Sequence, residues 1–168
     1  AEYDVSLPRR ESKTGKGHKG FLVNTDPQMT FEEASARRDF TINSIGFDPI
    51  HQLWLDPHHG QEDLRKGILR HVGPAFAEDP LRVLRGAQFA ARLNFQLAPE
   101  TLELCQTLDL NELSRERLLG EFKKLLLRAE RPSIGLEILR QAKTLRFFPE
   151  LEALIDVPQD PTWHPEGC

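Results

Sequence analysis

The residues with the clearest chemical potential lie between Glu78 and Arg92. Asp79, Arg82 and Arg85 recur every three residues, so a helix over this stretch would place one carboxylate and two guanidiniums on a single face. The apolar residues of the stretch fall on another face, which is suited to packing: Leu81, Leu84 and Ala91. The charged face would be a fixed row of one hydrogen-bond acceptor and two donors.

Such a row can distinguish nucleobases. Cytosine and adenine present an amino donor beside a ring-nitrogen acceptor, whereas guanine and uracil present a carbonyl beside an N–H. Asp79 could accept from the amino group while Arg82 donates to the ring nitrogen, and each mismatched polar contact would cost about 1–3 kcal/mol. A structural role is the alternative, because Asp79 followed by Pro80 is also a favourable helix N-cap. The spacing alone leaves both interpretations open.

Composition limits the classes of function. The 168 residues, 39% of them hydrophobic, suffice for one core or for one core with a smaller appended part. The net charge of -4 provides no general attraction to RNA, so a nucleic-acid contact requires a local basic patch. The two cysteines, Cys105 and Cys168, are too few for a disulfide framework or a zinc site. We find no apolar run of about 20 residues and no leader, and expect a cytoplasmic protein without a membrane span.

A second charged cluster, Arg37-Arg38-Asp39, follows a predicted helix. Thr30 and Glu33 fit a capping box, so this helix should begin after Thr30 and run to about Arg38. The helix dipole favours cations at that end, which would explain the two arginines on structural grounds alone. Binding of a phosphate by the guanidiniums is the alternative.

The rest of the chain predicts short strands followed by helices. We expect a basic loop over residues 8–20, a hairpin over 45–56, a short helix from Gly60 and a short strand over 68–72. From Ala75 onward the chain should be helical, with helix starts at Pro99 and Pro132 and an N-cap at Ser114. One apolar stripe is assigned to the helical core: Leu118, Phe122, Leu125 and Leu126.

The two charged motifs together resemble a known family. The string AFAEDPLRVLR over residues 75–85, preceded by RRDFTIN over 37–43, resembles the class II tRNA nucleotidyltransferases, or CCA-adding enzymes, and the related bacterial poly(A) polymerases. The resemblance covers nearly the whole chain and implies an α+β fold. Residues 1–72 would be the remnant of a polymerase-β-type nucleotidyltransferase head, 73–157 an all-α neck and body that selects the nucleotide, and 158–168 a linker and the start of a truncated HD-type domain.

The resemblance also implies a reaction, the template-independent addition of C and A from CTP and ATP to the 3′ end of tRNA. Asp79 and Arg82 would act as the template for base selection, Arg38 and Arg85 would contact the sugar and phosphates, and Glu78 would orient its neighbours. The implied nucleotide-binding residues are Arg37, Arg38, Asp39, Asn43, Glu78, Asp79, Arg82, Arg85 and Gln88. Gln88 stands where family members commonly carry an arginine, which removes one charge near the triphosphate.

Further residues match the family outside these motifs. Asp4 lies where a strand of the family's head often carries a further carboxylate, which makes it a candidate catalytic residue, and a solvated aspartate on an edge strand is the alternative. The basic loop matches the family's flexible loop, whose cations could steer a triphosphate or an RNA end: Arg9, Arg10, Lys13 and Lys16. Asp56 and Gly60 match a segment that flexes between nucleotide additions, although a simple connector is an equal alternative.

The family's Asp-x-Asp pair, which holds magnesium, is absent from the sequence. Metal-assisted phosphoryl transfer needs such carboxylates. We therefore predict no metal site within this chain, Mg²⁺ as the cofactor of the complete enzyme, and a chain that binds CTP and ATP weakly and transfers nothing by itself. A poly(A) polymerase and a non-catalytic helical RNA-binding or adaptor module remain as alternatives, and the oligomeric state is left open.

Overall fold

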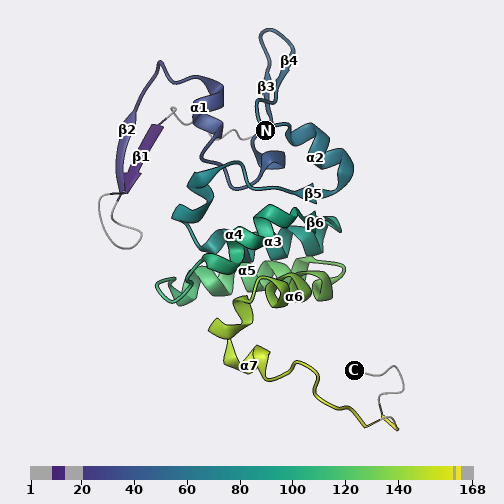
Figure 1. Ribbon diagram of the computed structural model, residues 1–168. Helices are drawn as coiled ribbons and strands as arrows, with labels where there is room; N and C mark the ends of the chain where they lie inside the picture. The colour runs from purple at the N-terminus through teal and green to yellow at the C-terminus, as the bar shows by residue number, and fades with distance from the viewer. Residues whose placement is uncertain (1–8, 14–20, 161, 164–168) are drawn as a thin grey trace.

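The computed structural model describes residues 9–13, 21–160 and 162–163, with side chains from Asp26 onward. Short strands and short helices come first, and the helices α3 to α6 follow as a separate layer beneath them (Figure 1). This arrangement confirms the predicted α+β class, with a head remnant followed by a helical body.

The head contains two antiparallel hairpins and two short α-helices. Strand β1 pairs with β2 from Arg9↔Thr25 to Lys13↔Phe21, and β3 pairs with β4 from Gly46↔Leu55 to Asp48↔Leu53. The elements are β1 Arg9–Lys13, β2 Phe21–Thr25, α1 Phe31–Ser35, the 3-10 helix η1 Thr41–Asn43, β3 Gly46–Asp48, β4 Leu53–Leu55 and α2 Gly60–Lys66. The predicted hairpin over 45–56 and the helix from Gly60 are confirmed.

Two details of the head differ from expectation. The predicted basic loop begins as a strand, because Arg9, Arg10 and Lys13 belong to β1 and pair with β2. Helix α1 has the predicted capping box, in which Glu33 N donates to Thr30 Oγ1, but it ends at Ser35 rather than near Arg38. The chain after α1 turns inward and becomes extended at the fully buried Phe40, which pairs with His71.

Head and helical body are joined by backbone pairing. Strand β5, Ile68–Leu69, pairs in parallel with β6, Gln96–Leu97, which follows the first long helix of the body. The strand is shorter than the predicted 68–72 because the chain beyond it pairs elsewhere, at the bridge between Phe40 and His71. The pairing of β5 with β6 brings the end of the head against the helices.

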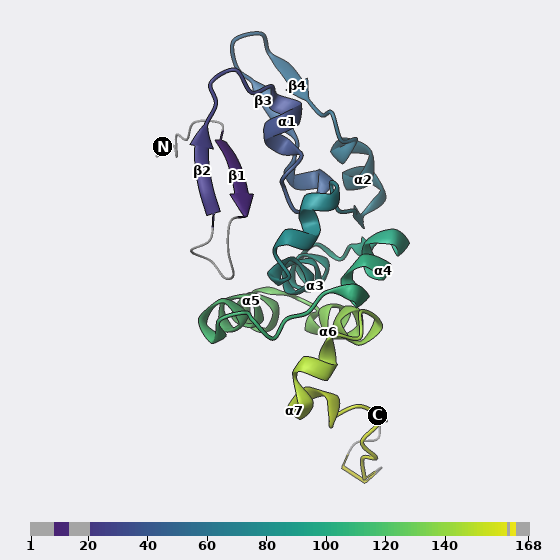
Figure 2. The ribbon, with the colours of Figure 1, turned by 60° about the vertical axis from the view of Figure 1, so that its left-hand side comes forward.

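The body consists of helices around a central one, α3. Its elements are the 3-10 helix η2 Pro74–Glu78, α3 Leu81–Leu93, α4 Pro99–Thr107, α5 Arg115–Arg128, α6 Pro132–Gln141, the 3-10 helix η3 Thr144–Phe147 and α7 Pro149–Glu152. The predicted helix starts at Pro99 and Pro132 and the N-cap at Ser114 are confirmed. Helix α3 packs against both α5 and α6, and Figure 2 shows the three helices nearly end-on. No helix in the described part of the chain is long and apolar enough to cross a membrane.

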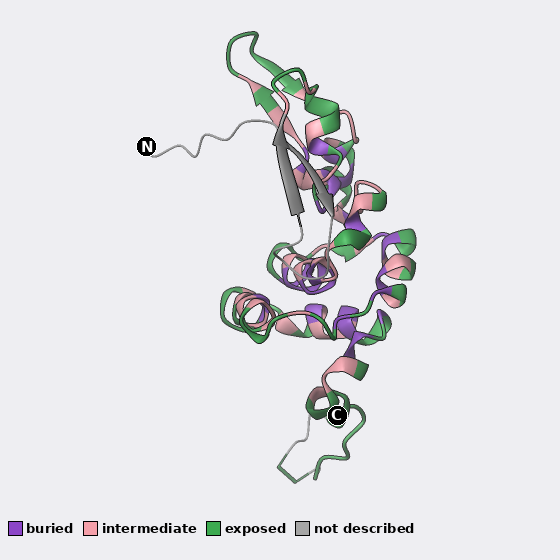
Figure 3. Cartoon of the chain, turned by 90° about the vertical axis from the view of Figure 1, so that its left-hand side faces the viewer, coloured by how far each residue is buried: buried purple, intermediate pink, exposed green. Residues whose placement is uncertain are grey.

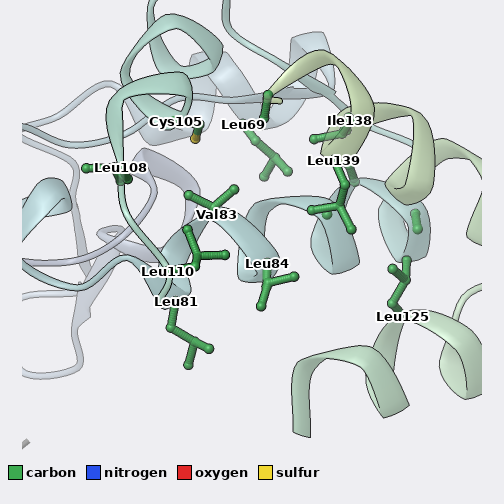
Figure 4. Close-up of a cluster of buried hydrophobic side chains, with 14 of the residues drawn as sticks. Leu69, Leu81, Val83, Leu84, Cys105, Leu108, Leu110, Leu125, Ile138 and Leu139 are labelled. Atoms are coloured by element: carbon green, nitrogen blue, oxygen red, sulfur yellow. The ribbon is translucent and has the colours of Figure 1, made fainter. Parts of the chain in front are cut away.

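The core lies where these helices face one another (Figure 3). Val83 and Leu84 of α3 belong to one buried cluster with Leu125 of α5 and Leu139 of α6 (Figure 4). The predicted stripe on α5 is correct for Leu125 and for its half-buried members, but wrong for Leu126, whose side chain is 52% exposed. Leu126 follows Leu125 directly, so it lies about 100° around the helix from its buried neighbour.

One glycine sets the spacing of the helices. Gly135 of α6 lies so close to α3 that a Cβ at this position would meet Leu125 Cδ1 and come within 2.7 Å of the Ala87 carbonyl oxygen. Gly120, inside α5, has nothing within 4 Å of the same position. A side chain is therefore excluded at one helical glycine and accommodated at the other.

We expect Gly135→Ala to destabilise the chain by about 2 kcal/mol, because the added methyl group must push α6 away from α3. Gly120→Ala, the matched control, should stabilise it by about 0.5–1 kcal/mol through helix propensity alone. Urea unfolding followed by circular dichroism measures both changes. Equal effects of the two substitutions would show that the close approach at Gly135 has no energetic role.

Candidate functional site

The predicted charged face lies at the start of α3. Asp79 precedes this helix with an extended backbone, φ -128 and ψ 96, and the helix begins at Leu81. The Leu81 amide donates to Asp79 Oδ1 at 3.3 Å, and the Arg82 amide donates to the Asp79 carbonyl at 3.0 Å. The capping alternative is thus partly present, although the helix starts one residue later than proline at the first position would require.

The other oxygen of Asp79 faces α5. Arg117 Nη2 donates to Asp79 Oδ2 at 2.7 Å, with the two side chains 24% and 31% exposed. The pair joins residues 38 positions apart in sequence. Asp79 is therefore held by the protein on both carboxylate oxygens.

Arg82 is held by backbone carbonyls rather than by a carboxylate. Its Nη1 donates to the Ala75 carbonyl of η2 at 2.6 Å, and its Nη2 donates to the Arg37 carbonyl of the head at 2.7 Å. Burial lowers the pKa of Arg82 below its usual value, although Asp39, Asp79 and Glu78 oppose this effect. One guanidinium thus bridges the head and the segment that leads into α3.

The third residue of the face, Arg85, pairs with Asp39. Arg85 Nε and Nη2 lie 2.7 and 2.6 Å from Asp39 Oδ2. Asp39 Oδ1 accepts from the Phe40 amide and from Asn43 Nδ2, each at 2.9 Å. Burial would raise the pKa of Asp39, but the Arg85 guanidinium and these hydrogen bonds together hold the pKa below its ordinary value. The carboxylate is therefore ionised and fully engaged.

A second buried carboxylate lies beside Arg85. Glu121 of α5 is 5% exposed, and its Oε1 accepts from Lys124 Nζ at 2.7 Å. Arg85 Nη1 is 4.0 Å from the same oxygen. Glu121 Oε2 is buried without a hydrogen-bond partner within the described residues. Arg85 thus lies between the carboxylates of Asp39 and Glu121.

Three further residues follow Arg85 along α3, namely Gln88, Phe89 and Arg92. Gln88 is 1% exposed and accepts from Arg92 Nη1 at 3.1 Å. The guanidiniums of Arg85 and Arg92 lie over the Phe89 ring, 5.3 and 5.9 Å from its centroid. Gln88, which we predicted to contact the nucleotide directly, is thus packed inside the helical layer.

The remaining head residues lie around the turn after α1. Arg38 is exposed and lines a small pocket of about 80 Å³ with residues of α1 and η1. Arg37 supplies the carbonyl that accepts from Arg82, and Glu78 is exposed at the end of η2. The structure thus brings the two predicted motifs together, with Asp39 and Arg37 against Arg85 and Arg82.

The residues matched to a hinge are tightly packed. Asp56 caps α2, accepting from the Gly60 amide at 2.7 Å and from the Gln61 amide at 2.9 Å. A side chain at Gly60 would collide with the Thr41 backbone, so the close approach requires glycine. Asp4 and Lys16 lie outside the described residues.

Sequence reasoning missed three contributors to this site, namely Arg117, Glu121 and Lys124. Arg117, Glu121 and Lys124 recur every three or four residues on α5, which is a helical charged face like that of α3. That periodicity was available in the sequence, but the pairing of one face with the other depends on how α3 and α5 pack.

The site does not fit a magnesium ion. Within the described residues no group of three or more His, Cys, Asp or Glu side chains could hold a metal. The carboxylates of Asp39, Asp79 and Glu121 are each paired with a guanidinium or an ammonium group. Oxygen ligands engaged in this way are unsuited to a hard divalent cation.

Two family models and many curated proteins match this chain. Residues 2–70 match the family described as "Poly A polymerase head domain", and residues 94–155 match "Probable RNA and SrmB- binding site of polymerase A". A "Multifunctional CCA protein" of Nitrosococcus oceani is 49% identical over 168 residues, covering 97% of this chain and 41% of the relative. One of Xylella fastidiosa is 46% identical over 171 residues, with the same coverage of 97% and 41%.

Solved structures show the same likeness. The crystal structure of the Bacillus stearothermophilus CCA-adding enzyme in complex with CTP is 36% identical with a TM-score of 0.63, and the match covers 70% of this chain and 30% of that one. A tRNA-processing enzyme in an apo form is 31% identical with a TM-score of 0.63, covering 90% of this chain and 44% of the other. This chain belongs to the family of tRNA nucleotidyltransferases and poly(A) polymerases. It spans about two fifths of the length of the curated relatives it matches.

The ion pair of Asp39 predicts a pH dependence. Because the pKa of Asp39 is lowered on folding, its contribution to stability is complete above the ordinary value of 3.8 and is lost as the pH falls through the lower folded-state value. Asp39→Asn should cost about 2 kcal/mol at neutral pH, since Arg85 loses an ionised partner. Stability should then fall less steeply below pH 3.8 in the variant than in the wild type.

Urea unfolding at a series of pH values measures both effects. Glu103→Gln, which removes an exposed carboxylate from α4, is the control and should leave the acid limb of the profile unchanged. Identical acid limbs for Asp39→Asn and the wild type would contradict the assignment.

Proposed function

We propose that this chain is the nucleotide-selecting part of an enzyme that adds C and A, from CTP and ATP, to the 3′ end of tRNA. The observation that carries the proposal is the meeting of the two charged motifs at the start of α3, where Arg82 donates to the Arg37 carbonyl and Arg85 pairs with Asp39. Asp79, three residues before Arg82, lies at the same junction of head and body. The names of the similar proteins, including an enzyme solved with CTP, support the same reaction.

Base selection would use the hydrogen-bonding positions of Asp79 and Arg82 that the contacts within the protein leave unoccupied. A carboxylate has about four acceptor positions, and the contacts with Arg117 and Leu81 engage one on each oxygen of Asp79. A guanidinium has five N–H groups, of which two in Arg82 donate to the carbonyls of Ala75 and Arg37. Asp79 can therefore accept from the amino group of cytosine or adenine while Arg82 donates to the adjacent ring nitrogen.

Some of the other residues would contact the nucleotide, and others would hold those residues in place. Arg38, exposed beside the small pocket, is suited to phosphate, and the Arg85 guanidinium to phosphate or sugar. Asp39 accepts from Arg85, Asn43 and the Phe40 amide, so we assign it to holding Arg85 in place. Asn43 donates to Asp39 through Nδ2, and its amide oxygen can accept from a ribose hydroxyl.

Transfer itself would need the rest of the protein. We propose Mg²⁺ as the cofactor of the complete enzyme, because phosphoryl transfer requires a cation at the reacting oxygens. The carboxylates described in this chain do not fit that ion. The chain alone should therefore bind nucleotides without transferring them. We propose a cytoplasmic location, where tRNA, CTP and ATP occur together.

A poly(A) polymerase is the second candidate, favoured by the description of the family that matches residues 2–70. The complete protein, incubated with tRNA lacking its 3′ end and with each labelled triphosphate in turn, distinguishes the two reactions. Incorporation of both CMP and AMP would support CCA addition. Incorporation of AMP alone would show that the enzyme is a poly(A) polymerase instead.

We expect the chain to bind CTP and ATP about tenfold more tightly than UTP and GTP, because a buried polar mismatch costs about 1–3 kcal/mol. Asp79→Ala and Arg82→Ala should each remove this preference. Titrations followed by NMR suit the weak affinities expected, and Glu103→Ala on α4 is the control for an exposed carboxylate. Equal binding of all four triphosphates by the wild type would instead favour a non-catalytic RNA-binding or adaptor module.

A further inference from the structure

Arg117 occupies an unusual place on α5. It lies in the first turn of that helix, where its amide donates to the N-cap hydroxyl of Ser114 at 3.4 Å. The positive end of a helix dipole disfavours a cation there by about 0.3–1 kcal/mol. A guanidinium in this position needs a compensating anion, and Asp79 supplies it at 2.7 Å.

Asp79 in turn depends on this contact for its orientation. The residue lies between η2 and α3 with an extended backbone, so no helical geometry fixes its side chain. Its hydrogen bond with the Leu81 amide is long, 3.3 Å, whereas its bond with Arg117 is short. The side chain of Arg117 therefore provides the stronger restraint on the carboxylate.

The surroundings make that restraint effective. Both side chains are less than one third exposed, at 24% and 31%, so solvent screens the pair less than a surface ion pair. Helix α5 is packed against α3, and the buried Leu125 and Gly135 lie in the same three-helix contact. The guanidinium thus projects from a rigid element rather than from a loop.

We propose that Arg117 is a positioning residue that determines base specificity by fixing the carboxylate of Asp79. Holding Oδ2 leaves Oδ1, with only the long bond from Leu81, to face an incoming base. A carboxylate fixed in this way accepts from the amino group of cytosine or adenine and opposes the carbonyl of uracil or guanine. The inference rests on the proposed function, since it names what supports the same base-reading residue.

The test compares two substitutions on one helix. Arg117→Met keeps the length of the side chain but removes its charge and donors, and Arg128→Met removes the same charge from the exposed last turn of α5. NMR titration of the chain with CTP, ATP, UTP and GTP gives the ratio of the Kd for UTP to that for CTP. This ratio reports selection, which a general loss of packing would not change.

We expect Arg117→Met to reduce the ratio about tenfold, the effect of one hydrogen bond between charged groups. Arg128→Met should leave the ratio unchanged, and Arg117→Lys, which retains the charge, should restore part of it. Circular dichroism shows whether each variant is folded, and Arg117→Gln, which also removes the charge, decides the question if Arg117→Met is not folded. In that case an Arg117→Gln ratio equal to that of the wild type would refute the proposal.

The outcomes separate the two proposals. A wild type that prefers CTP, together with an Arg117→Met variant that prefers it equally, overturns the role of Arg117 and leaves the proposed function intact. A wild type without any preference overturns both. Loss of affinity for all four triphosphates in equal measure would make Arg117 a general structural residue and would also refute its role in specificity.

Discussion

The structure depends on the compensation of charge along one helix. Asp79, just before α3, and Arg82 and Arg85 of α3 are half-buried, and charges in such a place require partners. The partners come from two directions, the turn after α1 and the face of α5. The same residues that would read a nucleotide therefore also hold three segments of the chain together.

The head and the body are joined by more than this face. Arg70, after β5, donates to the buried Asp63 of α2 and also pairs with Glu100 of α4. His71 uses its backbone amide and its ring to contact Thr101, a fully buried residue of α4. With the pairing of β5 and β6, these contacts tie α2 of the head to α4 of the body.

What could be predicted from the sequence was mostly local. The capping box at Thr30, the N-cap at Ser114 and the prolines at helix starts depend on a few neighbouring residues, so their patterns survive in any tertiary context. Helix α1 ends early because the chain turns to bury Phe40 in the core. The capping residues at the start of the helix carry no information about this burial. The extended start of the basic loop likewise depends on its pairing with β2.

In the candidate site, too, local features could be predicted from the sequence, whereas features that depend on packing could not. The residue types and the spacing on α3 indicated which side chains are chemically able to act, and the family resemblance connected them with the cluster before Phe40. The partners on α5 could not be predicted, because Arg117 and Glu121 reach α3 only through the packing of two helices. The exposure of Leu126 is a further result of how α5 is rotated in that packing.

The two carbonyls that hold Arg82 bear on the thermodynamics of ligand exchange. Where a guanidinium already rests on backbone oxygens, a hydrogen bond to a ligand that displaces one of them replaces a contact of similar strength. The net enthalpy of such an exchange is small, and the empty site never leaves those donors unsatisfied. Under the proposed function, such a contact would release its ligand readily, as a site that accepts cytosine and adenine in turn requires.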